Sequence, residues 1–465
     1  MRIHQGPASP GSGSVGRSSA LFYFRSGGGF ATRLHLFDYW RIKRGIDVGL
    51  VVSIRDAQGN LLRREAPVFD SSPVIELNVA DAPEGSVEVE AFSSRDLVIP
   101  YAAVTAEYLA PRSVCLVHSY SRAYDQREIE QGLVVSPGEE MGWTLRDGPG
   151  VSSIGILHNG SLPRRPQTVR LRIVNGAGET VESEVLLGAL KPHEIARIEP
   201  ARHVADLTRF LRGGNGYAAL SFRADGVFPR MLVGNETRDE IQLTHSNFDY
   251  GRHEAGEVEG EGALRVPGFT DLARAITVYP QRAEGVLRIC GPEGERLAEA
   301  GRALRLPWSA PGPGLFRVRG AGRRLPTRVV TGLELAAGGL PVETSMGIYH
   351  ARFPRQRFRW GAIPREGDAE IHLHDASPCQ EAAGPDVEVQ LRLYSALRSD
   401  FLERTVQWYE LQGRGGGVPV RELFGEAERF LESGPGAFTI FSEYPWLFPS
   451  VAFRRGGSLA FEHAF

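Results

Sequence analysis

The chain has 465 residues, of which 42% are hydrophobic and 23% are charged, and it carries a net charge of −3. This is the composition of a globular protein, and the length exceeds what one hydrophobic core normally serves. The charge balance argues against a nucleic-acid-binding protein, and the absence of any run of about 20 apolar residues predicts no membrane span.

The N-terminal segment, residues 1–19, is rich in Gly, Ser and Pro and lacks the apolar core of a secretory signal, so it is predicted to be disordered. Three widely spaced cysteines form neither a disulfide framework nor a CxxC metal motif. Cys115 and Cys290 lie in apolar runs and are predicted to be buried. These features place the protein in the cytoplasm by default, with non-classical export or a surface location as the alternative.

A recurring signature divides the remaining chain into four copies. Each copy has a Gly that precedes a strand-like run, then an apolar residue followed by Pro, and finally a His near a second strand end. Self-similarity of this kind indicates a repeat architecture. The four sets are Gly85, Ile99-Pro100 and His118; Gly216, Phe228-Pro229 and His245; Gly314, Leu325-Pro326 and His350; Gly436, Phe448-Pro449 and His463.

An early turn between alternating runs marks each copy as a β-structure. Asp or Asn first and Gly fourth is typical of a type I turn closing a hairpin. The turns are Asp56–Gly59, Asn175–Gly178, Gly291–Gly294 and Ser395–Arg398. The number and spacing of the strands predict antiparallel β-sandwiches of immunoglobulin-like or related topology.

Copies two and four each contain a predicted short amphipathic helix, over Pro200–Leu211 and Pro419–Leu431, followed by Gly. The interval from turn to proline is equal in these copies, residues 178 to 229 and 398 to 449, and shorter in the others. The sequence therefore predicts an all-β chain of four tandem β-sandwich-like repeats arranged as a duplicated pair, with a short helix in repeats 2 and 4. The expected repeats span residues 20–125, 140–250, 262–353 and 356–465, with an acidic Gly-rich linker at 251–261.

Histidines are the first candidate site residues. His372 and His374 alternate along one strand, so both imidazoles share a face, and His463 or Glu462 as a third ligand would suit a divalent metal such as Zn²⁺. The strand-end residues His118, His245, His350 and His463 are either a polar binding array or structural residues that satisfy backbone carbonyls. Recurrence in all copies favours the structural role.

Aromatic residues are the second candidates. Trp360, Trp408, Tyr409, Tyr444 and Trp446 are predicted to lie in loops or at strand ends, where they would form a surface for sugars or a protein. The alternative is that the tryptophans are buried in the cores. Acidic pairs such as Asp239-Glu240 belong to no distinctive catalytic motif.

These observations favour a non-enzymatic multidomain scaffold or binding protein that engages a polysaccharide or a protein partner through loop aromatics and arginines. A metal-assisted, hydrolase-like enzyme with a His-based site at a repeat junction is the first alternative. A self-assembling structural protein, and with it a homo-oligomer, is the second. No cofactor is expected other than a possible divalent metal.

Overall fold

The protein is described by a computed structural model that covers residues 15–132, 141–221, 226–248, 258–269, 271–279, 286–299, 301–309, 314–325, 330–336, 339–347, 357–375, 386–412 and 417–464. Its described residues form eight antiparallel sheets with only short helices between them. Two sheets belong to each of four consecutive repeats, so the all-β tandem architecture is confirmed. No helix within the described ranges has the length and apolar character needed to cross a membrane.

The first two repeats have the same strand order in both sheets. Repeat 1 pairs β1 (Gly16–Arg25), β6 (Glu84–Ser93), β3 (Gly49–Asp56) and β4 (Leu61–Glu65) in one sheet, and β5 (Val74–Val79), β2 (Ala31–Phe37), β7 (Val104–Leu109) and β8 (Val114–His118) in the other. Repeat 2 pairs β9 (Met141–Leu145), β14 (Gly216–Ser221), β11 (Gln167–Asn175) and β12 (Thr180–Leu187), and then β13 (Ile195–Ile198), β10 (Ser152–His158), β15 (Leu232–Glu236) and β16 (Ile241–His245). A short β17 (Asn247–Phe248) extends the first of these sheets beside β9.

Repeats 3 and 4 have this order again. Repeat 3 pairs β18 (Val258–Val266), β23 (Gly314–Leu325), β20 (Val286–Gly291) and β21 (Gly294–Glu299), and β22 (Leu304–Trp308), β19 (Ala273–Tyr279), β24 (Val330–Ala336) and β25 (Val342–Met346). Repeat 4 pairs β26 (Phe358–Ile363), β31 (Gly436–Phe441), β28 (Glu388–Ser395) and β29 (Phe401–Gln407), and β30 (Val418–Pro419), β27 (Asp368–Asp375), β32 (Leu447–Arg455) and β33 (Ser458–His463). The glycine of the recurring signature is therefore the first or second residue of the sixth strand in every repeat.

The hairpin turns between the third and fourth strands form where the sequence predicts them. The Gly59 N–H donates to the Asp56 carbonyl at 3.0 Å, and the Gly178 N–H donates to the Asn175 carbonyl at 2.9 Å. Both glycines have a positive φ, 82° and 81°, which residues with a Cβ rarely adopt. Turn chemistry thus sets the register of these hairpins.

The predicted helices are shorter than expected and are interrupted. In repeat 2 a 3₁₀ turn (Pro200–Arg202) is separated from α3 (Leu207–Leu211) because Asp206 adopts a left-handed φ of 51°. In repeat 4 the segment divides into α5 (Val420–Leu423) and α6 (Ala427–Leu431), since Phe424 is extended. Both pairs lie between the fifth and sixth strands, which agrees with the duplicated-pair arrangement. Additional short helices are α1 (Tyr39–Arg44), α2 (Gln126–Glu130) and α4 (Trp408–Gln412).

Three further expectations need correction. Residues 16–19 belong to β1, with Ser18 and Ser19 buried against β6, and residues 258–261 of the expected linker belong to β18. The first and second strands of each repeat lie in opposite sheets, whereas immunoglobulin domains keep them in one. His35, His158 and the His372/His374 pair lie on the second strand of their repeats.

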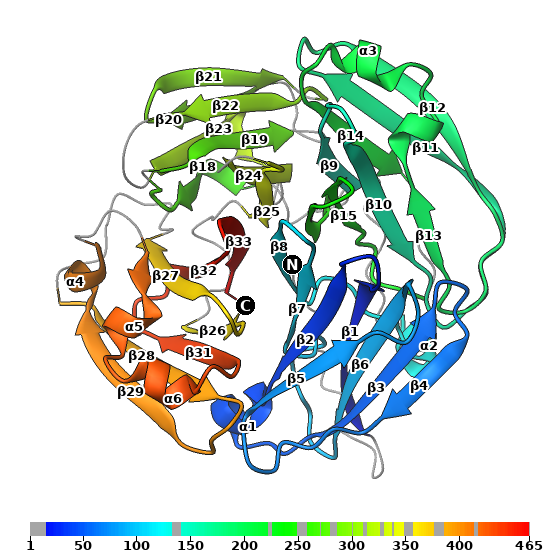
Figure 1. The fold of residues 1–465 in the computed structure, drawn as a ribbon. Helices are drawn as coiled ribbons and strands as arrows, with labels where there is room; N and C mark the ends of the chain where they lie inside the picture. The colour runs from blue at the N-terminus through cyan, green and yellow to red at the C-terminus, as the bar shows by residue number, and fades with distance from the viewer. Residues whose placement is uncertain are drawn as a thin grey trace.

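The four repeats close into a ring whose centre is lined by the last strand of each repeat (Figure 1). β8 contacts β16 and β33, and β25 contacts the same two strands, so the inner strands form a continuous circuit. Repeat 4 meets repeat 1 through the stacked rings of Trp360 and Phe37, with centroids 5.3 Å apart. Repeat 2 meets repeat 3 through Tyr217 and Tyr279, stacked at 4.1 Å.

The N–H and C=O groups at the unpaired edges of the inner strands form hydrogen bonds with side chains and not with a further strand. On β16, the N–H of Ile241 donates to Ser113 Oγ, whose hydroxyl donates to the Ile241 carbonyl, and Cys115 Sγ lies 2.9 Å from the Leu243 carbonyl oxygen. On β8, the N–H of Val114 donates to Ser458 Oγ at 2.9 Å. Backbone groups that would otherwise be buried without a partner therefore bond to side chains of the neighbouring repeat.

The Cys115 thiol should therefore be chemically inert in the folded protein. Burial raises its pKa to about 12, so the reactive thiolate is scarce at neutral pH. In a Cys290→Ser, Cys379→Ser variant, we expect no reaction with Ellman's reagent until denaturant is added, and one thiol per chain thereafter. Rapid labelling of the native variant would contradict burial at this seam. Cys290, expected to be buried, is half-buried in the structure, and Cys379 lies outside the described residues.

Candidate functional site: the ring axis

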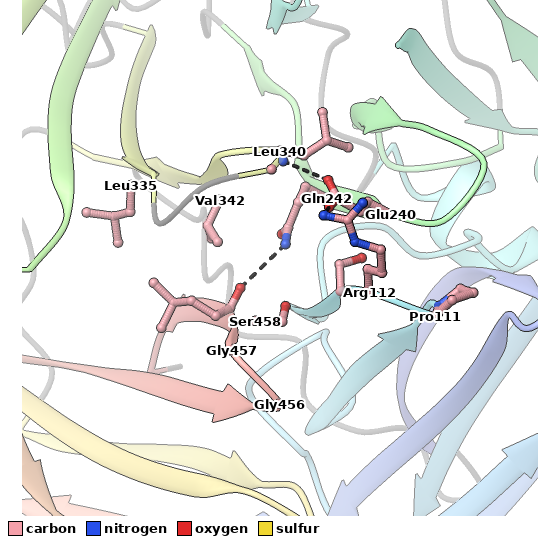
Figure 2. Close-up of a pocket in the computed structure, with 13 residues that line it drawn as sticks. Pro111, Arg112, Glu240, Gln242, Leu335, Leu340, Val342, Gly456, Gly457 and Ser458 are labelled. Atoms are coloured by element: carbon pink, nitrogen blue, oxygen red, sulfur yellow. Dashed lines mark hydrogen bonds and ion pairs between the residues drawn. The ribbon is translucent and has the colours of Figure 1, made fainter. Parts of the chain in front are cut away.

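The hairpin tips that precede the inner strands converge on a pocket at one end of the ring axis (Figure 2). Its volume is about 370 Å³. The lining comes from all four repeats: Pro111, Arg112 and Ser113; Glu240 and Gln242; Leu335, Gly339, Leu340 and Val342; and Gly456, Gly457, Ser458 and Leu459. Since these segments are adjacent only when the ring is closed, the pocket is a product of the whole chain.

Glu240 connects three of the repeats at this pocket. Its carboxylate lies 3.3 Å from the Arg112 guanidinium of repeat 1 and accepts the Leu340 N–H of repeat 3 at 2.8 Å. Gly339 has a φ of 74°, and a Cβ there would lie 2.6 Å from a Glu240 carboxylate oxygen. The close approach of this turn to the carboxylate therefore requires glycine.

Gln242 makes the matching connection deeper in the pocket. Its Nε2 donates to the carbonyls of Val114 in repeat 1 and Leu459 in repeat 4, at 3.3 and 3.4 Å. Because carbonyl oxygens only accept, these contacts fix the orientation of the amide. The Gln242 Oε1 atom is buried, with no hydrogen-bond partner among the described residues.

The opposite ends of the inner strands bring together three imidazoles. The ring centroids of His118 and His463 lie 4.3 Å apart, those of His118 and His245 4.9 Å, and those of His245 and His463 6.0 Å. From Val114 to His118, a strand of five residues separates this cluster from the pocket by about 13 Å. His350, the corresponding residue of repeat 3, lies outside the described residues.

Burial controls the charge of this histidine cluster. It lowers the pKa of His118 and of His463 to about 3, and it holds the pKa of His245 well below the ordinary value, with Arg230 adding to the effect at His118 and His245. Glu462 reaches into the same space, with Oε1 3.3 Å from His118 Nδ1 and 2.8 Å from the His463 backbone nitrogen. Burial raises the pKa of that carboxyl group.

The structure does not bring His372 and His374 together with His463. His372 and His463 both lie opposite Ser450, one on each side of β32, so a strand separates them. The Phe448 ring lies 5.2 Å from the His374 ring and 5.6 Å from the His463 ring. Among the described residues, His463 instead meets His118 and His245, which offer one nitrogen each within 4.8 Å of one another.

The three candidate tryptophans do not form an exposed surface, which corrects the expected ligand-binding surface and agrees with the alternative that they are buried in the cores. Trp360, Trp408 and Trp446 are buried. The reason is packing between and within repeats, since Trp360 covers the seam with repeat 1 and Trp408 belongs to the core of repeat 4. Tyr444 is half-buried, and its hydroxyl donates to Asp375 at 3.1 Å. Tyr409 belongs to α4, and its side chain lies outside the described part of the chain.

A second group of titratable residues lies away from the axis, on the inner sheet of repeat 1. His35 Nε2 is 3.1 Å from Glu107 Oε2, and its Nδ1 is 4.0 Å from Glu76. Arg33 lies 3.6 Å from Glu107 and Arg365 lies 3.0 Å from Glu76. The two guanidinium groups neutralise the two carboxylates, so this group is an ion-pair network between repeats 1 and 4.

Sequence reasoning did not single out Arg112 or Gln242, and it named Glu462 only as an alternative third ligand for His372 and His374. It set Glu240 aside as part of an ordinary acidic turn. The available signal was positional. Each of these residues lies in the last hairpin or last strand of a copy, the segment in which the repeat signature ends with its histidine.

Comparisons with known proteins identify no family. No protein-family model matches the chain, and no curated protein matches it. A search of solved structures gives the native conformation of E. coli alpha-2-macroglobulin, with 10% sequence identity and a TM-score of 0.13. The match covers 96% of this chain and 28% of that one.

Proposed function

We propose that the protein is a non-catalytic binding scaffold whose axial pocket holds one sugar unit of a polysaccharide. The observation that carries this proposal is the convergence of hairpin tips from all four repeats on one pocket. A site built jointly by four repeats gives the closed ring a role that a single sandwich cannot have.

The chemistry of the pocket supports a polyhydroxylated ligand. Arg112 donates hydrogen bonds, Glu240 accepts them, and Ser458 contributes a hydroxyl group. Leu335, Leu340, Val342 and Leu459 supply apolar surface for the C–H face of a sugar. The Glu240 carboxylate pairs with Arg112 and accepts the Leu340 N–H. These contacts suit a carboxylate that accepts hydrogen bonds from hydroxyl groups better than one that donates a proton.

Arg112→Ala is expected to weaken polysaccharide binding at least tenfold. The side chain is 68% exposed and contributes little to stability, so loss of binding would report on the site and not on folding. Binding should be measured by calorimetry and affinity electrophoresis across a panel of polysaccharides, with reducing-end release followed in the same samples.

Arg429→Ala is the matched control, since Arg429 forms an exposed ion pair with Glu426 at 2.7 Å on α6, away from the axis. It should bind like the unmodified protein. Equal binding by the Arg112 variant, or no binding to any polysaccharide, would overturn the proposal. Release of reducing ends would replace it with the hydrolase alternative, and binding only to a protein would favour a protein-recognition role.

A further inference from the structure

We infer that the ring axis carries a transition-metal site of the zinc type, in which His118, His245 and His463 supply nitrogen ligands and Glu462 supplies a carboxylate. This site is separate from the axial pocket and lies at the other end of the inner strands. It joins repeats 1, 2 and 4, so a bound ion would cross-link the ring where three chain segments meet.

Geometry carries the inference. One nitrogen from each imidazole lies within 4.8 Å of one nitrogen of each of the others. In a tetrahedral zinc site with Zn–N distances of about 2.0 Å, ligand nitrogens are roughly 3.3 Å apart. The imidazoles are thus within about 1.5 Å of ligand spacing, a gap that small side-chain rotations close.

Hydrogen bonding leaves ring nitrogens available as ligands. The Nδ1 atom of His245 faces the Ser246 carbonyl at 3.3 Å, and that of His463 faces the Ala464 carbonyl at 3.5 Å. A proton on Nδ1, donated to the carbonyl, places the lone pair of the neutral ring on Nε2. This backbone partner also orients the imidazole, as the outer contacts of metal-bound histidines commonly do.

Glu462 completes the donor set and offsets part of the charge of a divalent ion. Its Oε1 atom is 3.3 Å from His118 Nδ1 and 3.8 Å from His463 Nε2, so the carboxylate lies beside two of the three ligands. It also accepts the His463 N–H at 2.8 Å, which restrains its position. Three imidazoles and a carboxylate match the preferences of Zn²⁺ and of Co²⁺, its spectroscopic substitute.

Titration of untagged, chelator-treated full-length protein with Co²⁺ would test this inference. We expect one Co²⁺ per chain, visible absorption bands of a four-coordinate ion, displacement by Zn²⁺, and a higher Tm for the metal-bound protein. The absence of stoichiometric Co²⁺ and Zn²⁺ binding by the unmodified chain would overturn the inference without recourse to any variant.

Variants then locate the site. His245→Gln and His463→Gln should each abolish the Co²⁺ bands, whereas Glu462→Gln should weaken Co²⁺ binding about 10- to 100-fold. His374→Gln, which alters a buried histidine of the same repeat outside the cluster, should leave the bands and stoichiometry unchanged. Retained binding in His245→Gln, or its loss in His374→Gln, would contradict the assignment. Circular dichroism of the metal-free variants shows whether each is folded.

Discussion

Arg146→Met is expected to lower the free energy of unfolding by about 3–5 kcal/mol, because it leaves the buried Glu343 carboxylate without its arginine and removes the more buried of the two arginines that pair with Glu334. Arg146 follows β9 in repeat 2 and lies 2.9 Å from Glu334 and 2.7 Å from Glu343, both in repeat 3. All three side chains are largely buried. Burial raises the pKa of Glu343, and the Arg146 guanidinium opposes that rise. Urea unfolding of the full chain would measure the loss.

Arg305→Met provides a matched control at the same carboxylate. Arg305 pairs with Glu334 at 2.6 Å but is 41% exposed, so its removal should cost under about 1 kcal/mol. Combining Arg146→Met with Glu334→Gln and Glu343→Gln should recover much of the stability, since no uncompensated charge remains. Equal losses for the two single arginine variants would show that burial at the seam between repeats 2 and 3 is not what sets the effect.

Acidification from pH 7 to pH 5 is expected to destabilise the fold through its buried histidines, with His158 contributing about 2 kcal/mol. His158 Nε2 lies 2.6 Å from the Tyr120 hydroxyl oxygen, and burial lowers its pKa to about 3. An unfolded histidine has a pKa of about 6.5, so the unfolded state takes up the proton first. The stabilisation is therefore complete above pH 6.5 and is lost as the pH falls from there toward 3. Burial lowers the pKa of His374 to about 3 as well, with the same sign.

His158→Gln isolates this contribution. Between pH 7 and pH 5, the free energy of unfolding of the variant should fall less than that of the unmodified protein. The difference should be roughly 1.4 kcal/mol per pH unit below 6.5, the effect of one proton that only the unfolded state takes up. His203→Gln, at a half-buried histidine of the same repeat, serves as the comparison. An unchanged pH dependence in His158→Gln would mean that this imidazole is already protonated in the folded protein, or accessible to water.

The sequence predicted the parts of the fold that depend on local chemistry. Asp56–Gly59 and Asn175–Gly178 specify their turns through a positive φ at the final glycine and a short hydrogen bond, both of which are properties of a few adjacent residues. The four-copy organisation followed because such turns recur at corresponding places. Helix continuity was predicted less well, since the amphipathic pattern of residues 200–211 continues through the left-handed Asp206.

Ring closure and the axial site were not predictable in the same way. They depend on contacts between residues more than 100 positions apart, such as Ser113 with Ile241 and Ser458 with Val114. The tryptophans illustrate the same difficulty: Trp360 of repeat 4 stacks on Phe37 of repeat 1, a residue far from it in the sequence. A strand-end histidine likewise gives no indication in its own segment that two others will lie beside it.

The hydrogen bonds between the inner strands also bear on how the ring can be assembled. Hydroxyl and thiol side chains, and not a shared strand, join the inner edges of repeats 1 and 2 and of repeats 1 and 4. Ser345 and Thr244 do the same between repeats 2 and 3, so the chain need not be continuous at that seam for the circuit to form. The two halves of the ring carry helical insertions at the same place and present the same kinds of strand edge to each other. A chain of two repeats would meet the same requirement by pairing with a second copy of itself.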